Sequence, residues 1–383
     1  MTRQLEGVLP GGALARVTIT GAVIGGIEVL SARAAESDAP RILPGLVDLQ
    51  VNGYAGFDVN ADDVAVAEIA ALTHALREAG TTTYFPTVVT ASEEKILHAL
   101  ATIADAAGGD PELAHAIGGI HVEGPALSEV DGPRGAHDTS QLRDPDVAEL
   151  ERWISASRGL LRIVTLAPER AGSREYIERA RRAGVMISIG HTDATPEQIH
   201  DAADAGAVLS THLGNGIQPV LPRHPNQLWA QLADDRLTAG IIADGQHVPA
   251  DAFTAMVRAK GRGRSFIVSD SAALAGSKPG TYSSPVGGSV TVTASGRLEL
   301  AGTGLLAGSG ASLADCLRWA TRETGIPPLD VLAMCTEVPA GLAGLEGRGS
   351  LRVGASADLV VVDEHLDVQR VIVAGADVSA RGR

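Results

Sequence analysis

The sequence predicts an α/β protein built on a TIM-like (β/α)8 barrel, with a small β-sandwich formed by both ends of the chain. Two observations favour the barrel. Eight candidate strands alternate with helices over roughly 250 residues, and polar residues end several of these strands. An open doubly wound sheet is the competing arrangement. We favour the barrel because barrel active sites are built from residues at the carboxyl ends of several strands.

Both ends of the chain show strand patterns without long helices between them. The strand candidates are residues 15–20, 27–30, 357–363 and 368–374. Residues 15–20 alternate polar and apolar side chains, and a Gly-Gly pair at 25–26 marks a turn. We therefore expect residues 1–42 and 346–383 to form one β-sandwich domain beside a catalytic barrel of residues 43–345.

The middle of the chain alternates strand and helix patterns. The strand candidates are residues 43–51, 82–89, 117–122, 161–166, 185–189, 207–211, 239–243 and 265–269. Apolar residues at helical spacing predict helices that include 64–79, 93–106, 173–183, 196–205 and 250–260. Residues 281–300 are rich in Gly, Ser and Thr and predict a β excursion after the eighth strand, before a last helix that carries Cys316.

The bulk composition limits the classes of function. The chain has 383 residues, 45% of them hydrophobic, so a large core is available. The net charge of −15 argues against nucleic acid or an anionic membrane as a partner. No apolar run approaches the roughly 18 residues of a membrane span. Residues 1–7 lack the apolar core of a signal peptide, and the two cysteines, Cys316 and Cys335, do not form a disulfide framework or a metal motif. We therefore expect a reduced, cytoplasmic protein.

Glu123, His191 and His212 each follow an apolar run and precede glycine or a small turn. Because the carboxyl ends of barrel strands meet at one face, we expect these side chains to converge. A catalytic zinc site needs about three such ligands and an open position. The alternative for each histidine is a hydrogen-bonded structural role, but the repeated position at strand ends favours a metal site.

Three further polar residues lie at or near predicted strand ends. Asp270 ends the eighth strand, where a carboxylate beside a metal site can act as general acid and base; a helix N-cap is the alternative. His247 follows the seventh strand and could donate a hydrogen bond to a carbonyl or a sugar hydroxyl. The alternative, about equally common, is a partly exposed loop histidine. His121 lies two residues before Glu123 on the same strand face and suits a supporting role better than ligation.

The stretch from 213 to 226 offers candidates for substrate binding. Arg223 has the forked donor geometry that suits a phosphate, although an exposed arginine without a ligand is at least as common. Asn215 and Gly216 either add backbone donors or form an ordinary turn. The glycine-rich pieces at 302–304 and 308–310 match neither the Walker nor the dinucleotide pattern, so we predict no nucleotide.

Seven short motifs, taken together, are far more specific than any one of them. They are Leu43-Pro-Gly-Leu-Val-Asp48, His121-Val-Glu-Gly-Pro125, Gly190-His-Thr-Asp-Ala-Thr195, Thr211-His-Leu-Gly-Asn215, Ala243-Asp-Gly-Gln-His247, Ser269-Asp-Ser271 and Leu306-Ala-Gly-Ser309. With these motifs the chain resembles the N-acetylglucosamine-6-phosphate deacetylase family of the amidohydrolase superfamily. The resemblance covers nearly the whole length.

The resemblance implies the same barrel and β-sandwich, and it assigns roles to residues. It implies that Glu123, His191 and His212 bind one divalent metal ion, with Zn2+ expected first and Fe2+, Mn2+ or Co2+ as alternatives. Asp270 is implied as the catalytic acid and base, and His247 as the group that polarises the amide or holds the sugar. Implied substrate contacts are Ala136, Asn215, Gly216, Leu306, Ala307 and Gly308, with Arg223 at the phosphate. Proteins similar to this one are usually homodimers or homotetramers.

Two stretches depart from the family pattern. Gln50-Val-Asn52 stands where many superfamily members carry His-x-His, and because amides are poor ligands we predict a single tightly bound metal. Gly214-Asn-Gly-Ile217 replaces the usual aromatic residue followed by Asn-Ala-Met, which alters the pocket floor.

The resemblance therefore predicts a metal-dependent amide hydrolase that removes acetyl from an N-acetyl amino sugar. The first expectation is N-acetylglucosamine 6-phosphate, giving glucosamine 6-phosphate and acetate. A related amidohydrolase acting on a different N-acyl or cyclic amide is the first alternative, because the 214–218 loop is altered. A non-catalytic paralogue that binds sugar phosphates is the second.

Overall fold

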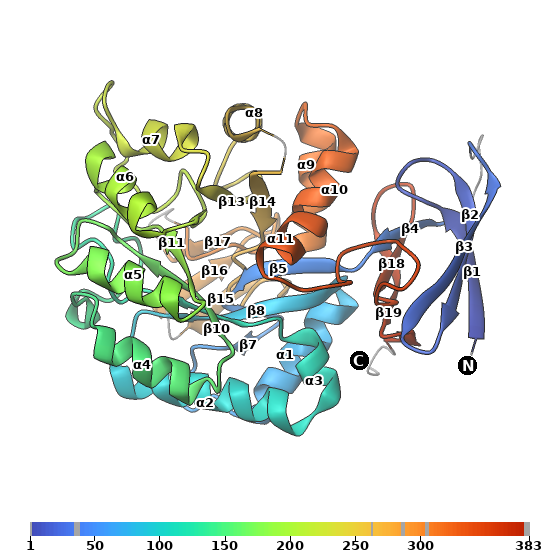
Figure 1. Ribbon diagram of the computed structural model, residues 1–383, viewed down its shortest axis with the longest axis horizontal. Helices are drawn as coiled ribbons and strands as arrows, with labels where there is room; N and C mark the ends of the chain where they lie inside the picture. Colours follow the sequence, from blue (N-terminus) through green and yellow to red (C-terminus); the bar gives the residue numbers. More distant parts are fainter. Residues whose placement is uncertain (1, 34–38, 262, 285–287, 303–305, 379–383) are drawn as a thin grey trace.

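The computed structural model describes residues 2–33, 39–261, 263–284, 288–302 and 306–378. Its larger part is a barrel of strands wrapped by helices, and its smaller part is an all-β unit at one end, where both termini lie (Figure 1). The barrel strands in chain order are β5 (Leu46–Val51), β8 (Thr81–Val89), β9 (Ile120–Glu123), β10 (Leu161–Leu166), β11 (Met186–Ile189), β12 (Leu209–Ser210), β13 (Thr238–Ile242) and β14 (Ser265–Val268).

Parallel pairing joins these eight strands of the described chain in sequence order, from β5 to β14. The two ends of this sheet then meet. Ser271, just after β14, forms a parallel bridge with Val51, and the Asp270 N–H donates to the Gln50 carbonyl over 3.1 Å. The sheet is therefore a closed barrel, and the alternative of an open doubly wound sheet is wrong.

The predicted helices form and cover the outside of the barrel (Figure 1). The α-helices of the described residues are α1 (Val66–Glu78), α2 (Glu93–Gly109), α3 (Pro111–Ala116), α4 (Val147–Ala156), α5 (Ser173–Arg182), α6 (Pro196–Ala205), α7 (Gln227–Ala233), α8 (Ala250–Lys260), α9 (Leu313–Glu323), α10 (Pro328–Met334) and α11 (Glu337–Leu342). Local chemistry sets their starts. In α6, for example, Thr195 and Gln198 form a capping box ahead of Pro196 in the first turn.

Both ends of the chain together build the small all-β unit, as predicted, and its strands form one continuous sheet. Its strands are β1 (Thr2–Val8), β2 (Leu14–Thr20), β3 (Val23–Ser31), β4 (Arg41–Pro44), β18 (Leu359–Val362), β19 (Val368–Val373) and β20 (Ala376–Asp377). β4 pairs with β1 on one side and with β18 on the other, which joins the two ends. Val17, Ile24, Leu359 and Ile372 share one core cluster, so strands from both halves enclose a common interior.

The chain passes from this sheet into the barrel at Gly45, between β4 and β5. The predicted strand 43–51 is thus two strands that belong to different sheets. The division into residues 1–42 plus 346–383 and residues 43–345 stays a prediction.

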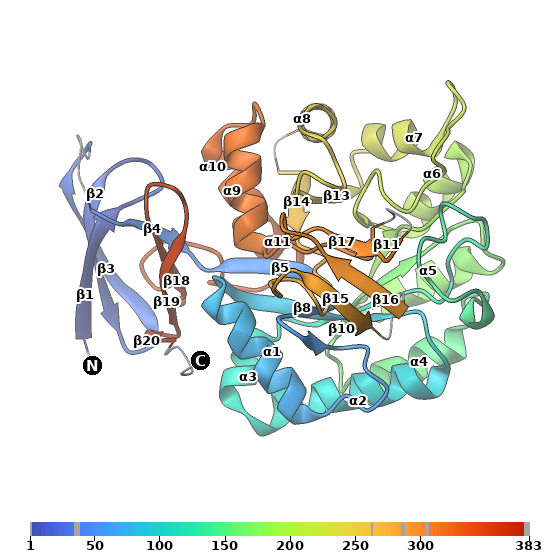
Figure 2. The same ribbon diagram turned by 180° about the vertical axis from the view of Figure 1, so that it is seen from behind.

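The predicted excursion after the eighth strand is an antiparallel sheet of β15 (Gly280–Ser284), β16 (Gly288–Val292) and β17 (Leu298–Leu300). Seen from behind, these strands lie in front of the barrel (Figure 2). Val290, Val292 and Leu298 form their core and pack on Ala272 and Leu274, which follow the eighth barrel strand. A short hairpin of β6 (Gly53–Tyr54) and β7 (Phe57–Asp58) follows β5.

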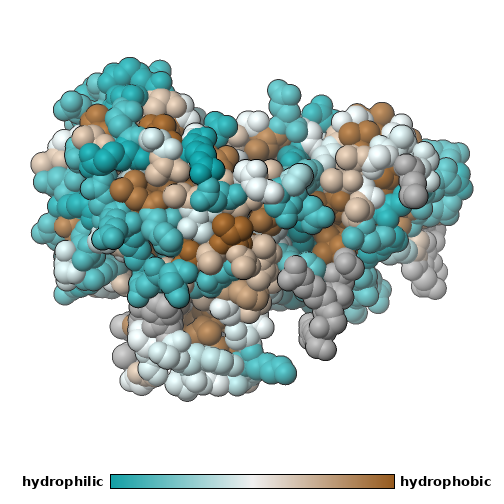
Figure 3. Space-filling model, turned by 90° about the horizontal axis from the view of Figure 1, so that it is seen from below, coloured by the Kyte–Doolittle hydropathy of each residue, from teal (hydrophilic) through white to brown (hydrophobic). Residues whose placement is uncertain are grey.

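The surface seen from below mixes hydrophilic and hydrophobic residues, with the hydrophobic ones in small groups (Figure 3). Among the described residues, no helix has both the length and the apolar character that a membrane crossing requires.

A buried ionic cluster ties the terminal sheet to the barrel. The carboxylate of Asp358, directly before β18, accepts from His115 Nε2 of α3 over 2.9 Å, from the Ala374 N–H over 2.7 Å and from Arg348 over 3.3 Å. Arg348 also donates to Thr83 of β8. Burial opposes ionisation of Asp358, but the hydrogen bonds from His115 and Ala374 outweigh it and lower the pKa of the carboxyl.

We predict that Asp358→Ala costs about 3 kcal/mol of unfolding free energy, because it leaves buried cationic and N–H groups without their acceptor. The loss is full above the unfolded-state pKa of about 3.9 and disappears as pH falls through the lower folded value. Urea unfolding at pH 7 and at acid pH measures both effects. Asp377→Ala removes an exposed carboxylate paired with Arg370 and should cost less than about 1 kcal/mol. Equal losses for the two variants would contradict the prediction.

Candidate metal centre and active site

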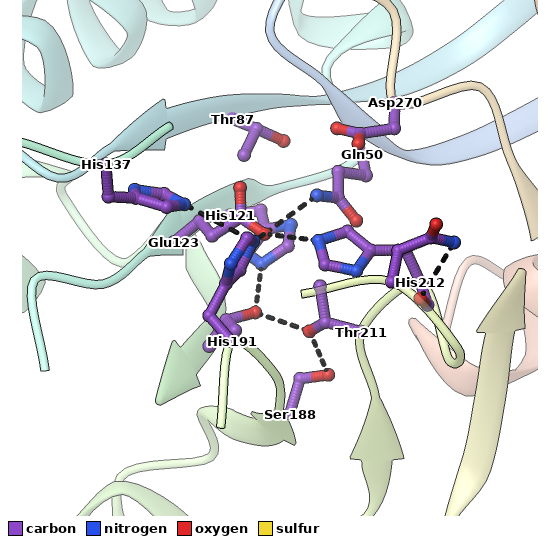
Figure 4. Close-up of polar contacts among 12 residues, drawn as sticks. Gln50, Thr87, His121, Glu123, His137, Ser188, His191, Thr211, His212 and Asp270 are labelled. Atoms are coloured by element: carbon purple, nitrogen blue, oxygen red, sulfur yellow. Dashed lines mark hydrogen bonds and ion pairs between the residues drawn. The ribbon is translucent and has the colours of Figure 1, made fainter. Parts of the chain in front are cut away.

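Glu123, His191 and His212 converge at the carboxyl ends of their strands (Figure 4). His212 Nε2 lies 3.0 Å and His191 Nε2 lies 3.4 Å from the same oxygen, Glu123 Oε1. One ligand atom from each residue lies within 4.8 Å of the others, and all three residues are buried. The convergence expected from the strand-end pattern is therefore present.

The backbone turns sharply where these side chains enter the barrel mouth. His191, His212 and Asp270 directly follow or closely follow strands β11, β12 and β14, and their φ angles are +49°, +27° and +48°. Positive φ is costly for residues other than glycine and persists mainly where the surrounding structure enforces it, often at functional sites. The same unusual turn thus aims three of the predicted site residues at one point.

The hydrogen bonds around His191 define which of its nitrogens faces Glu123. His191 Nδ1 lies 2.8 Å from the Pro133 carbonyl oxygen, which only accepts, so Nδ1 carries a proton. In the neutral ring, Nε2 then presents a lone pair to the Glu123 carboxylate. Two acceptors 3.4 Å apart in a buried site repel each other unless a cation lies between them.

These donors fit a divalent metal ion. With metal–ligand distances of about 2.1 Å, tetrahedral ligand atoms lie roughly 3.4 Å apart, close to the separations of the imidazole nitrogens from Glu123 Oε1. Burial opposes ionisation of Glu123, but the contacts with His191 and His212 outweigh it and lower its pKa well below the usual value. The carboxylate is therefore charged and suited to a cation.

Gln50 and His121 support the cluster from within the barrel (Figure 4). Gln50 Nε2 donates to Glu123 Oε1 over 3.1 Å, so the amide at this His-x-His position acts as a donor to a ligand. His121 Nε2 lies 2.7 Å from Thr165 Oγ1 and its Nδ1 lies 3.3 Å from the Leu49 carbonyl. Burial lowers the pKa of His121 to about 4, so the ring is neutral at pH 7. Both of its nitrogens are engaged away from the cluster.

Asp270 lies beside the cluster, after β14. Asn52 Nδ2 donates to its Oδ1 over 2.7 Å, and burial raises the pKa of Asp270 to about 6. A bridge at Ser271 and then a turn follow Asp270, so the alternative of a helix N-cap is wrong. A carboxyl with this pKa can take up and release protons near neutral pH, as acid–base catalysis requires.

His247 follows β13 in a turn, and its Nδ1 lies 2.7 Å from Asp244 Oδ2. The ring is largely buried, although the residue as a whole is partly exposed. Its Nε2 is the nitrogen that this contact leaves available for a substrate.

The structure places the predicted substrate-binding residues on three loops. The Asn215 N–H donates to the His212 carbonyl over 2.9 Å, and Gly216 packs so closely on His191 that a Cβ would lie 2.8 Å from Nδ1. Leu306, Ala307 and Gly308 precede Ser309, whose N–H donates to the Asp270 carbonyl. Ala136 is exposed on the loop after β9. Arg223 is not brought into this cluster and lies exposed on the loop before α7.

The motif-based prediction missed His137. Its Nε2 lies 3.3 Å from His191 Nε2, on the loop that follows β9 (Figure 4). Burial lowers the pKa of His137 to about 3, so the ring is neutral. Its position directly after Ala136, which the family resemblance had marked, was the available signal.

A barrel with Glu, His and His converging at strand ends defines a metal-dependent hydrolase of the amidohydrolase type. The amidohydrolase family model matches residues 41–378. An N-acetylgalactosamine-6-phosphate deacetylase of Escherichia coli O157:H7 is 33% identical over 94% of this chain and 93% of its own length. An N-acetylglucosamine-6-phosphate deacetylase of Bacillus subtilis is 33% identical over 87% of this chain and 83% of its own.

Solved structures agree with these relatives. One of them is an N-acetylglucosamine-6-phosphate deacetylase of Mycobacterium smegmatis, solved as an aspartate-to-alanine mutant in complex with N-acetylglucosamine 6-phosphate. Its sequence is 32% identical to this chain, and the two structures align with a TM-score of 0.87 over 99% of this chain and 100% of that one. The chain therefore belongs to the amidohydrolase family and, within it, to the N-acetylglucosamine-6-phosphate deacetylase family.

We predict that Glu123→Gln lowers bound divalent metal from about one ion per chain to near zero, because it removes the anionic ligand between two imidazoles. Elemental analysis of purified, folded protein measures the metal content. Glu149→Gln is the matched control, since Glu149 is also buried but pairs with Arg143 away from the cluster. A Glu123→Gln protein that keeps its metal would exclude Glu123 as a ligand.

Proposed function

We propose that this protein hydrolyses the N-acetyl amide of a 6-phosphorylated amino sugar, releasing acetate and the free amino sugar. The observation that carries the proposal is the convergence of Glu123, His191 and His212, with Asp270 beside them, in a member of a deacetylase family. N-acetylglucosamine 6-phosphate is the first substrate. N-acetylgalactosamine 6-phosphate is the second candidate, because a relative of that name is equally identical.

The cofactor in this proposal is one divalent ion per subunit, held by Glu123, His191 and His212. Zn2+ is the first choice, and Fe2+, Mn2+ and Co2+ also accept these ligands. When bound, such an ion supplies a Lewis acid for the amide carbonyl and for the attacking water.

The protein's own residues move the protons and hold the substrate. Asp270, oriented by Asn52, takes a proton from the attacking water and then returns it to the leaving amine. His247 donates a hydrogen bond to the amide oxygen, where negative charge develops in the transition state. Amide hydrolysis needs both tasks, because the amine leaves only when protonated.

The surrounding loops bind the sugar in this proposal. The substrate contacts are Ala136, Asn215, Gly216, Leu306, Ala307 and Gly308. Arg223 binds the phosphate in this proposal. It lies exposed on the loop before α7. This position suits a homodimer or homotetramer in which a partner subunit completes the phosphate end of the site. A cytoplasmic location remains part of the proposal.

Acetate release from metal-loaded protein tests the function directly. We expect release from the two N-acetylhexosamine 6-phosphates, with kcat/KM about 100-fold above that for unphosphorylated N-acetylglucosamine, the equivalent of about two charge-assisted hydrogen bonds. A panel of other N-acyl and cyclic amides runs alongside. Acetate or acyl release only from one of those amides would show that the proposed substrate is wrong. Tight binding of the sugar phosphate without any release would indicate a non-catalytic paralogue.

We predict that Asp270→Asn lowers kcat by a factor of about 10^2 to 10^4, because the amide can neither accept the proton from water nor deliver it to the amine. The metal content should stay at about one ion per chain, since Asp270 is outside the ligand set. Steady-state acetate assays and elemental analysis measure the two quantities. Asp251→Asn, an exposed acid in the first turn of α8, is the control. Near-normal turnover of the Asp270 variant would rule out its role.

A further inference from the structure

One buried carboxylate makes three contacts within the turn that carries His247. Asp244 follows β13 and is almost fully buried. Its Oδ1 accepts from the N–H groups of Gln246 and His247 over 2.8 and 2.9 Å, and its Oδ2 lies 2.7 Å from His247 Nδ1. Asp244 therefore sets both the backbone of the turn and the rotation of the imidazole ring.

The other side of the turn is held by an aromatic ring. Gly245 has φ +71°, and a Cβ built on it would lie 2.3 Å from Trp319 Nε1 of α9. Only glycine permits both this backbone conformation and this close approach. The turn from Asp244 to His247 is thus fixed between its own carboxylate and Trp319.

The contact with Asp244 decides what His247 can do chemically. A carboxylate only accepts, so His247 Nδ1 is the donor and Nε2 is the free nitrogen. In the neutral ring Nε2 only accepts hydrogen bonds. A donor at Nε2, which an amide oxygen needs, requires the imidazolium form, whose positive charge lies 2.7 Å from Asp244. Burial opposes ionisation of Asp244, but the bonds with His247 outweigh it and lower the pKa of the carboxyl, so it is charged at neutral pH.

We propose that Asp244 is the positioning residue of this site: it points His247 Nε2 at the substrate and balances the charge of the imidazolium that donates to the amide oxygen. The proposal rests on the proposed function, because it assigns how His247 performs its part of amide hydrolysis. Asp244 itself does not touch the substrate and acts through His247.

The test begins with Asp244→Asn, which preserves size and one acceptor oxygen but removes the charge. We expect kcat to fall by about 10^2 to 10^4, with KM changed less than about threefold. The upper end matches the loss of about 10^4 seen when the carboxylate of a Ser-His-Asp triad becomes an amide. The matched control is Asp234→Asn. Asp234 also accepts from a backbone N–H and contacts a histidine Nδ1, that of His200, but it follows α7 at the opposite end of the barrel. Turnover of the control should match the wild type.

A double-mutant cycle separates positioning from a purely structural role. In a His247→Gln background, Asp244→Asn should lower kcat less than about threefold further, because its effect passes through the imidazole. An equal loss of kcat in both backgrounds overturns the proposal.

Nitrogen-15 NMR of the histidine rings in the wild-type protein provides a readout that does not depend on turnover. We expect a protonated His247 Nδ1, with the signal assigned by its absence in His247→Gln. A ring protonated at Nε2 alone overturns the proposal. If the wild type releases no acetate from any amide while His247 is protonated at Nδ1, the proposed function fails and the Asp244 contact stands.

Discussion

The site depends on one electrostatic constraint: two imidazole nitrogens face a single buried oxygen of Glu123. The Pro133 carbonyl fixes the proton of His191 on Nδ1, so the lone pair of Nε2 points at an anion. A neutral imidazole nitrogen and a carboxylate that both accept are stable together in a buried site when a cation lies between them. The arrangement therefore suits a bound metal ion, and the carboxylate of Asp270 lies beside the cluster.

The hydrogen bonds that close the barrel also position residues of the site. The Asp270 N–H bonds to the Gln50 carbonyl where β14 meets β5, and the Gln50 side chain donates to Glu123. Asn52, also just after β5, donates to the Asp270 carboxylate. Asp270 and Glu123 are thus both positioned by hydrogen bonds across the seam. A site built on strands in this way is held more rigidly than one built on loops alone.

The terminal sheet supports the barrel from its far side without contributing a residue to the site described above. Asp358, directly before β18, bonds to His115 of α3 and to Arg348, and Arg348 also bonds to Thr83 of the barrel strand β8. The carboxyl ends of the strands remain free for the catalytic loops, as in other barrels of this class. The contacts between the terminal sheet and the barrel and the residues of the site thus lie at opposite ends of the barrel strands.

Alternating strand and helix patterns, with polar residues at strand ends, were enough to predict the barrel, and Glu123, His191 and His212 stood out because each ends an apolar run. Strand β1 escaped prediction because its polar-rich pattern becomes a strand only through pairing with β2. Sequence could not show that His137 reaches His191 or that Asp244 holds His247, because both contacts depend on how turns fold back toward the barrel mouth. Periodicity and residue type are local properties and determined the elements. Positive φ angles, barrel closure and the direction of each imidazole nitrogen arise from long-range packing, so only the tertiary structure decided them.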